Sequence, residues 1–286
     1  MEALKLNDEE FNLISSLVYN KFGIKLGEQK RALIIGRLQK VLHAGGFLSF
    51  KDYYKHVVSE PSGKALLNLV DKISTNHTFF FRENEHFDFL YDSILPGIIE
   101  GMQSKLKPAV RIWCAGCSSG EEPYTVAMVI SEFFKSHNDE VDIGILATDI
   151  STSSLEKAAA GIYPAERMEL VPLAYRNKYF TPLKDGNWGI KSHIKKMVLF
   201  RRLNLIRRDF PFKGLFQLIF CRNVMIYFDK DTQRDLVSRF HRYTASNGYL
   251  FIGHSETLDR STGLYKYIKP SIYQKYSIAQ ADLRRG

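Results

Sequence analysis

From about residue 108 onward, the chain alternates short apolar runs, rich in β-branched and aromatic residues, with longer amphipathic stretches. Alternation of this kind is typical of parallel strands joined by crossover helices, which cover both faces of a sheet. The pattern therefore predicts an α/β fold with a Rossmann-like, largely parallel sheet. The expected strands are VRIWCAG (110–116), DIGILATDI (142–150), FQLIFCR (216–222) and GYLFIGHSE (248–256), with edge strands from YKYIKPSIYQKYSI (265–278).

The first part of the chain has a different texture. Residues 8–92 carry apolar residues at spacings of three and four, with glycine and proline between the segments, so they predict a set of helices. We therefore expect two units, a helical domain with its linker over residues 1–92 and an α/β domain over residues 93–286. Within the second unit, turn signals crowd the stretch 163–200 around short alternating segments. They predict an inserted antiparallel β-hairpin or three-strand flap.

Composition places the chain among packed globular proteins, since 45% of its residues are hydrophobic and 25% are charged. No stretch approaches 18 consecutive apolar residues, and the first residues lack the basic and then apolar order of a signal peptide. We expect a cytoplasmic protein that does not insert into membranes. Cys114 and Cys117 have C-x-x-C spacing, but no second Cys or His pair follows at zinc-ligand distance, so we predict no metal.

The formal net charge of +9 would suit an acidic partner, such as a nucleic acid or an acidic protein surface. The excess is concentrated in residues 11–58 and 167–215, outside the segments with polar motifs. In the second expected helix, Lys30, Arg37 and Lys40 flank an apolar stripe within about one quadrant. A solvated charged face with no partner is the alternative interpretation.

A polar turn, AGCSSGEEPY (115–124), follows the first expected strand and opens a helix. Its glycines would let a ligand lie against bare backbone at the helix N-terminus. No Lys-Ser/Thr pair is present, which argues against a phosphate-binding P-loop, and Glu121 and Glu122 would repel a phosphate. The turn therefore favours a ligand with a cationic or hydroxyl-bearing part.

Further polar residues lie at the carboxyl ends of expected strands, where doubly wound sheets bind their ligands. Asp149 could accept hydrogen bonds from the ribose hydroxyls of an adenosine ligand; capping of the following helix is the alternative. Arg222, Asn223 and Tyr227 follow the third expected strand and are candidates for the reacting centre. The linking segment STNHTFFFRE (74–83) suits either a ligand wall or an interdomain core.

Together and in this order, TNHTFFFRE, AGCSSGEEPY, ATDIS, LNLI, IFCRNVMIYF and GHSE resemble the chemotaxis receptor methyltransferase family known as CheR. The resemblance covers nearly the whole chain. It implies a Rossmann-like methyltransferase domain with a small antiparallel β-subdomain, preceded by an all-helical N-terminal domain. It also implies S-adenosylmethionine as the methyl donor and S-adenosylhomocysteine as the product.

The resemblance assigns roles to residues by motif. Arg82, Arg222 and Tyr227 would face the methyl group and the incoming carboxylate as the catalytic residues. The residues expected to bind S-adenosylmethionine are Asn76, Thr78, Arg82, Glu122, Asp149, Asn204, Leu205, Arg222 and Asn223.

The activity that the resemblance implies is methyl transfer to glutamate side chains of chemotaxis receptors, which gives glutamyl methyl esters for sensory adaptation. The receptor substrate is a long helical bundle. Lys30, Arg37 and Lys40 would lie on it, and the enzyme would be recruited to receptor arrays. The stretch FTPLKDGNWGIKSHIKK (180–196) lacks the glycine-rich, arginine-containing loop by which some members bind a receptor's C-terminal pentapeptide. We therefore expect independence from this tether.

Two other functions share parts of the pattern. A nucleic-acid methyltransferase would use the same cofactor fold and the basic surface, but the chain has no Asn/Asp-Pro-Pro-aromatic motif and no Pro-Cys turn. A non-catalytic module that senses the cofactor or a receptor would not need Arg82, Asp149, Arg222 and Tyr227 together. We therefore expect an enzyme, with no nucleic acid as its partner.

Overall fold

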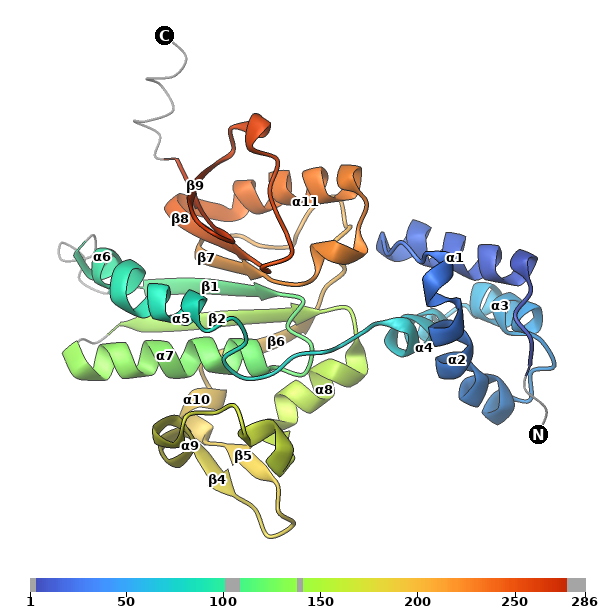
Figure 1. The fold of residues 1–286 in the computed structure, drawn as a ribbon, viewed down its shortest axis with the longest axis horizontal. Coiled ribbons are helices and arrows are strands. Elements are labelled where there is room, and N and C mark those ends of the chain that lie inside the picture. Colours follow the sequence, from blue (N-terminus) through green and yellow to red (C-terminus); the bar gives the residue numbers. More distant parts are fainter. Residues whose placement is uncertain (1–3, 101–108, 138–140, 277–286) are drawn as a thin grey trace.

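The computed structural model describes residues 4–100, 109–137 and 141–276. Within these ranges the chain forms a lobe built of helices alone and a larger lobe built around a seven-stranded sheet, joined by an extended segment (Figure 1). The predicted fold class, α/β preceded by a helical domain, is confirmed.

The helical domain packs around one apolar core. Its elements are α1 (Asp8–Phe22), the 3₁₀ turn η1 (Glu28–Lys30), α2 (Arg31–Gly45), α3 (Phe50–Ser59) and α4 (Lys64–Ile73). A capping box starts α1, because the side chains of Asn7 and Glu10 each accept a hydrogen bond from the other residue's backbone N–H. Ile34, Leu38 and Leu42 of α2 are fully buried, as the apolar stripe in the sequence predicts.

The chain leaves one core for the other between Ile73 and Phe80. Apolar residues up to Ile73 pack within the helical domain, whereas Phe80, Phe87 and Leu90 pack against the sheet. This change lies within residues 1–92, in the part expected to serve as the linker. The chain continues through α5 (Glu85–Phe89), the π-helical turn η2 (Leu90–Ile94) and α6 (Leu95–Glu100).

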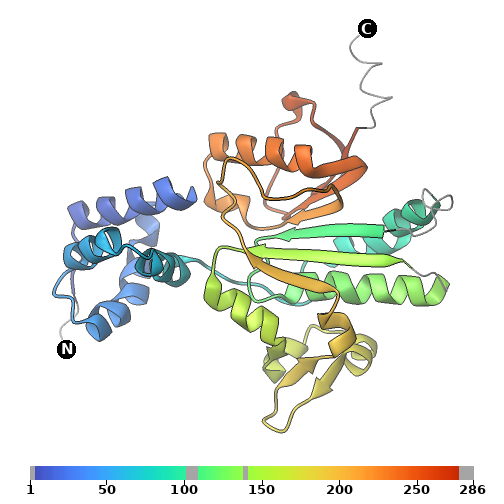
Figure 2. The same cartoon turned by 180° about the vertical axis from the view of Figure 1, so that it is seen from behind.

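The large sheet is mixed. Its strands are β1 (Ala109–Ala115), β2 (Asp142–Asp149), β6 (Val198–Arg202), β7 (Phe216–Cys221), β8 (Thr244–Ile252), β9 (Tyr265–Lys269) and β10 (Ile272–Lys275). They lie in the order β6-β2-β1-β7-β8-β10-β9 (Figure 2), and only the pairings of β10 are antiparallel. The strand order reverses between β1 and β7. In doubly wound sheets, the crevice outside such a reversal is where ligands bind.

Helices cover both faces of the sheet, as the sequence predicts. Along β1, Ile112 and Cys114 pack into a core formed with α7 (Glu121–His137), and the alternate residue Trp113 packs into a second core. That second core contains Leu236 and Phe240 of α11 (Lys230–Tyr243). Along the chain, β2 is followed by α8 (Thr152–Ala160).

The predicted flap is a separate three-stranded antiparallel sheet with the order β3-β5-β4. Its strands are β3 (Ile162–Tyr163), β4 (Phe180–Pro182) and β5 (Trp188–Ile190), accompanied by η3 (Ala165–Met168), α9 (Leu173–Tyr179) and α10 (Ser192–Lys195). Residues 198–200, at the end of the predicted flap, instead belong to β6, which pairs in parallel with β2 in the large sheet. These residues follow the flap directly, and so short a run shows no periodicity that would separate the edge strand from the flap.

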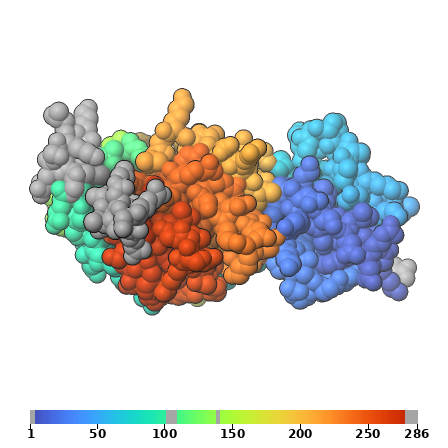
Figure 3. Space-filling view, turned by 90° about the horizontal axis from the view of Figure 1, so that it is seen from above, coloured from blue at the N-terminus to red at the C-terminus, as the bar shows by residue number. Residues whose placement is uncertain are grey.

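Hydrogen bonds connect the helical domain to the sheet lobe at several places. Asp71 of α4 accepts hydrogen bonds from the backbone N–H groups of Thr152 and Ser153 at the start of α8, at 3.0 and 3.2 Å. The backbone N–H of Lys25 donates to the carbonyl of Tyr227 at 2.9 Å. Seen from above, the two lobes meet across a narrow waist (Figure 3). Among the described helices, none has the length and apolar character required to cross a lipid bilayer.

We predict that Asp71→Ala weakens the attachment of the helical domain. The substitution removes the acceptor for two N–H groups at a helix start, which costs about 1 kcal/mol in typical N-cap replacements and about 2–4 °C in melting temperature at this size. Thermal unfolding followed by circular dichroism measures the change. Glu156→Ala, on the exposed side of the same helix, is the matched control, and equal melting temperatures for the two variants would contradict the prediction.

Candidate active site

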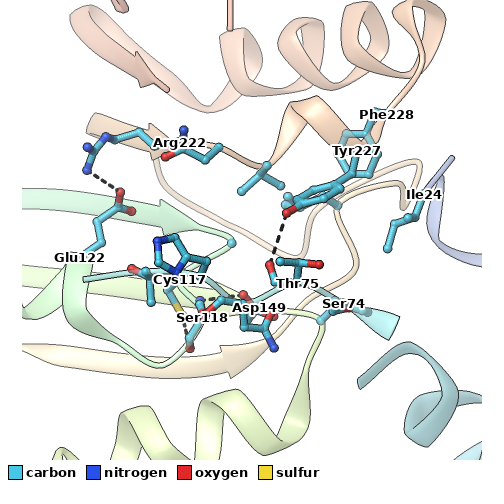
Figure 4. A pocket seen from close by; sticks show the side chains of 18 of the residues that line it. Ile24, Ser74, Thr75, Cys117, Ser118, Glu122, Asp149, Arg222, Tyr227 and Phe228 are labelled. Atoms are coloured by element: carbon cyan, nitrogen blue, oxygen red, sulfur yellow. Dashed lines mark hydrogen bonds and ion pairs between the residues drawn. The ribbon is translucent and has the colours of Figure 1, made fainter. Parts of the chain in front are cut away.

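A cavity of about 1120 Å³, counting its open mouth, lies where the helical domain meets the carboxyl ends of β1, β2 and β7. Phe22, Ile24 and Leu26 of the helical domain form part of its apolar wall. In Figure 4, Arg222 and Glu122 lie at one end of the cavity, and Tyr227 and Ile24 lie at the other.

The turn after β1 closes onto the end of β2. Gly116 and Cys117 donate their backbone N–H groups to the carbonyl of Thr148, at 2.7 and 3.0 Å. Gly116 has a φ of 85°, and a β-carbon there would collide with the side chain of Val224. Only glycine meets both demands, so the bare backbone that the sequence suggested is a geometric requirement of the turn.

Asp149 lies on the floor of the cavity. Its two carboxylate oxygens accept hydrogen bonds from the backbone N–H groups of Ser118 and Ser151, at 2.7 and 2.9 Å. Burial raises the pKa of Asp149, and these backbone hydrogen bonds oppose the rise by favouring the charged form. A carboxylate oxygen can accept more than one hydrogen bond, so Asp149 keeps acceptor capacity for a ligand. Helix capping, the alternative role, falls to Ser151, which accepts from the N–H of Ser154.

Arg222 is the centre of the charged network. Its side chain is 2% exposed, and its guanidinium binds Glu122 at 3.0 Å and Glu83 at 3.1 Å. It also donates to the backbone carbonyl of Arg82. Burial raises the pKa of Glu122, while the nearby Arg222 guanidinium favours its ionised form. The guanidinium therefore fixes the two carboxylates and the linker in one arrangement, although its Nε atom is buried without a hydrogen-bond partner among the described residues.

Arg82 has a different environment from Arg222. The only hydrogen bond of its guanidinium within the described residues runs to the carbonyl of His77, at 2.9 Å, and it forms no ion pair there. It lies over the ring of Phe79, with 5.7 Å between the guanidinium carbon and the ring centroid. Arg82 therefore keeps donors for an anionic group in the cavity, whereas the NH1 and NH2 groups of Arg222 already have protein partners.

Tyr227 faces the linker from the opposite wall. Its hydroxyl donates to the carbonyl of Thr75 at 3.3 Å, and the ammonium group of Lys30 lies over its ring, 4.6 Å from the centroid. Burial raises the pKa of Tyr227, so its hydroxyl stays protonated at neutral pH and acts as a hydrogen-bond donor. Burial also lowers the pKa of Lys30, and the positive charge of the nearby Arg37 lowers it further.

Backbone strain is concentrated around this cavity. Phe81, Glu83, Ser118 and Asn223 all have φ between 49° and 59°, a region that side-chain-bearing residues rarely adopt. Ser118 and Asn223 line the cavity, and Phe81 and Glu83 flank Arg82. Residues held this way cost about 1–3 kcal/mol each and cluster at functional sites. The strain supports a preorganised ligand site.

The structure brings together all of the residues predicted to bind the cofactor and all of the predicted catalytic residues. Lys30, predicted to bind a receptor, lines the same cavity. Arg37 and Lys40 lie outside it: Arg37 donates to the carbonyls of Ile73 and Ser74 at 2.9 and 2.7 Å, and Lys40 is exposed. The predicted residues that line the cavity are Asn76, Thr78, Arg82, Glu122, Asp149, Asn204, Leu205, Arg222, Asn223 and Tyr227.

Two carboxylates of the site were missed by the sequence analysis. Glu83 forms an ion pair with Arg222 and accepts a hydrogen bond from the side-chain amide of Asn223 at 3.3 Å. Glu256 accepts from the backbone N–H groups of Gly253, Asn223 and Ile226, at 2.6, 3.0 and 3.2 Å. Both lie inside the FFRE and GHSE motifs, so the motifs contained the signal. Apart from Gly253, however, the partners named here are 30 or more positions away, and spacing could not reveal them.

Comparison with known proteins identifies related sequences over almost the whole chain. A family model described as "CheR methyltransferase, all-alpha domain" matches residues 9–74, and one described as "CheR methyltransferase, SAM binding domain" matches residues 76–273. A chemotaxis protein methyltransferase of Borreliella burgdorferi is 45% identical over 272 residues, which cover 95% of this chain and 96% of that protein. The chemotaxis protein methyltransferase of Escherichia coli is 34% identical, covering 89% of this chain and 86% of that protein.

One solved structure aligns with most of the chain at low sequence identity. A magnesium protoporphyrin IX methyltransferase from Synechocystis with bound SAM aligns over 78% of this chain and 94% of that chain, at 11% identity and a TM-score of 0.36. The relatives found by sequence show the family of the chain.

We predict that Glu256→Gln destabilises the protein by about 1–3 kcal/mol, because the amide group that replaces one oxygen turns an acceptor of buried N–H groups into a donor. Urea unfolding followed by fluorescence gives the free energy of unfolding. The exposed Glu166→Gln provides the matched control. A Glu256→Gln protein as stable as this control would refute the positioning role of Glu256.

Proposed function

The chain belongs to the CheR family of chemotaxis protein methyltransferases, and on that premise we propose that it transfers the methyl group of S-adenosylmethionine to glutamate carboxylates of chemotaxis receptors. The observation that carries this proposal is the single cavity in which every predicted donor-binding and catalytic residue meets. Family membership gives the reaction class, and the arrangement of the side chains gives the roles below.

The residues of the cavity fit S-adenosylmethionine. Asp149 keeps acceptor capacity at the end of β2, where ribose hydroxyls bind in this class of sheet. Glu122 places negative charge at the glycine turn, which suits a cationic donor and would repel a phosphate. Asn76, Asn223 and the other lining amides offer both donors and acceptors for the methionine and adenine parts. When bound, the cofactor supplies a methyl group on a positively charged sulfur.

Arg82 is the residue that we assign to the incoming carboxylate. Its guanidinium has no carboxylate partner among the described residues, and it lines the cavity. Arg222 is committed to Glu122 and Glu83, so it holds the donor side of the site in place. Tyr227, protonated at neutral pH, can orient the carboxylate by donating a hydrogen bond in place of its contact with Thr75.

The reaction needs little acid or base catalysis. A glutamate side chain has a reference pKa of about 4.3, so it is ionised at neutral pH and can attack without losing a proton. The protein's contribution is then to align the two reacting atoms and to exclude water from them. The apolar wall of Phe22, Ile24 and Leu26 from the helical domain supports both effects.

The three basic residues predicted to bind a receptor lie in η1 and α2 and divide into two groups. Lys30 lines the cavity beside Tyr227, and Arg37 binds the carbonyls at the end of α4, so both have contacts within the protein. Lys40 is exposed and free to contact an acidic helix of the receptor. We place receptor binding on this face of α2, with Lys30 closest to the reacting carboxylate.

We predict that Arg82→Ala lowers methyl transfer by at least about 100-fold, because it removes a charge-assisted contact worth about 3 kcal/mol in a water-poor site. Tyr227→Phe removes one neutral hydrogen bond and should slow transfer by about 10-fold. Transfer of radiolabelled methyl groups to receptor cytoplasmic fragments, released by mild base, measures both. Arg234→Ala, exposed on α11, is the control. Near wild-type turnover by Arg82→Ala would overturn its assignment.

We further propose that the enzyme acts without the C-terminal receptor tether. The β4–β5 hairpin turns through residues 183–187, closed by a hydrogen bond from the N–H of Leu183 to the carbonyl of Asn187 at 2.8 Å. It leaves no long loop to surround a peptide. In calorimetric titration with a receptor C-terminal pentapeptide, we expect no binding at micromolar concentration. A dissociation constant in the micromolar range would contradict this expectation.

A further inference from the structure

A cluster of possible metal ligands lies beside the charged network of Arg222. Glu83 lies in the linker two residues before α5, His86 lies at the start of α5, and His254 follows β8. Their ligand atoms all lie within 4.8 Å of one another. Glu83 Oε2 is 3.6 Å from His86 Nδ1 and 4.0 Å from His254 Nε2. Ligand atoms of a tetrahedral zinc ion with bonds of about 2.0–2.1 Å lie about 3.3 Å apart, so small side-chain rotations would complete the site.

His86 gives an independent sign that a partner belongs here. It is 1% exposed, and neither of its ring nitrogens has a hydrogen-bond partner within the described residues. A buried polar group left without a partner costs about 1–3 kcal/mol. A metal ion bound to one of the ring nitrogens would supply the missing partner.

We propose that Glu83, His86 and His254 form a binding site for a divalent transition metal ion of the zinc type. Two imidazoles and a carboxylate suit zinc, whereas calcium and magnesium prefer oxygen ligands alone. Three protein ligands leave the fourth position of a tetrahedral site to a water molecule, and the exposed carboxylate of Glu85, whose Oε2 atom is 3.6 Å from His254 Nε2, adds negative charge beside it. The site revises the expectation of no metal, which considered only the cysteine spacing.

The positive charge of Arg222 is compatible with a cation in this position. Its guanidinium binds the carboxylate of Glu83 and also that of Glu122, and Glu85 adds a third carboxylate nearby. A hydrogen-bonded arginine behind a ligating carboxylate is an outer contact that orients the ligand. The other oxygen of Glu83 accepts from the backbone N–H of His254 at 3.2 Å, which fixes the carboxylate from a second side.

A metal bound here would join the linker to the loop after β8, two segments that already meet through a hydrogen bond and through the ring contact of His86 with His254. Glu83 follows Arg82 in the linker, and His254 belongs to the loop whose Glu256 holds the backbone of Asn223. The ion would therefore fasten the linker to the edge of the donor cavity. Binding to the folded state alone raises stability in proportion to the logarithm of metal concentration above the dissociation constant.

The test uses the full chain without a histidine tag, stripped of metal by a chelator and titrated with Co²⁺ alone. We expect visible absorption bands of four-coordinate Co²⁺ that saturate at one equivalent and disappear when Zn²⁺ is added. The melting temperature should rise on addition of Zn²⁺. His254→Ala, at an exposed position, should weaken binding at least 10-fold, and His56→Ala, exposed in the helical domain, should bind like the parent.

Two results would overturn the site. One is the absence of stoichiometric Co²⁺ or Zn²⁺ binding by the parent protein. In that case an ordered water would be the hydrogen-bond partner of His86. The other is equal affinity in the parent and His254→Ala. Glu85→Gln serves as a second variant should His254→Ala fail to fold, and it should weaken binding in the same direction. None of these readouts depends on methyl transfer, so they stand apart from the proposed function.

Discussion

The arrangement of the site depends on the buried ion pairs of Arg222. A guanidinium that is 2% exposed is stable only if its charge is paired, and Glu122 and Glu83 supply the pairing from α7 and from the linker. The three residues come from segments that are far apart in the sequence and meet at the reversal of strand order between β1 and β7. Removing one partner would leave an uncompensated charge in a dry environment, so the network fixes the geometry of the donor cavity. The guanidinium of Arg82 takes no part in these ion pairs within the described residues.

The helical domain is a structural part of the active site and not an appended module. Its apolar residues Phe22, Ile24 and Leu26 line the cavity, and Lys30 reaches the ring of Tyr227. Arg37 binds the carbonyls at the start of the linker, which directs the chain from α4 into the segment that carries Asn76 and Arg82. The domain on which we propose receptor binding thus also lines the donor cavity.

The sequence predicted the elements of the fold well because their signals are local. The apolar spacing of residues 8–92 predicted a set of helices, and α1 to α4 form within it; alternation identified the strands that form the central part of the sheet. Edge strand β6 was missed, since its few residues follow the flap without a break in pattern. In the site, the motifs named the lining residues, but the hydrogen bonds of Glu83, Glu256 and Arg37 could not be predicted. Each depends on tertiary contacts between segments 30 or more residues apart, for which spacing carries no information.

The central claim is that the cavity at the strand ends binds a cationic sulfur donor between glycine backbone and carboxylates. Calorimetric titration of ligand-free protein with S-adenosylhomocysteine, the demethylated product, tests it most directly. The account predicts saturable heat with one site per chain, a rise in melting temperature, and loss of both in Asp149→Ala. Absence of heat and of thermal protection in the parent protein would contradict it.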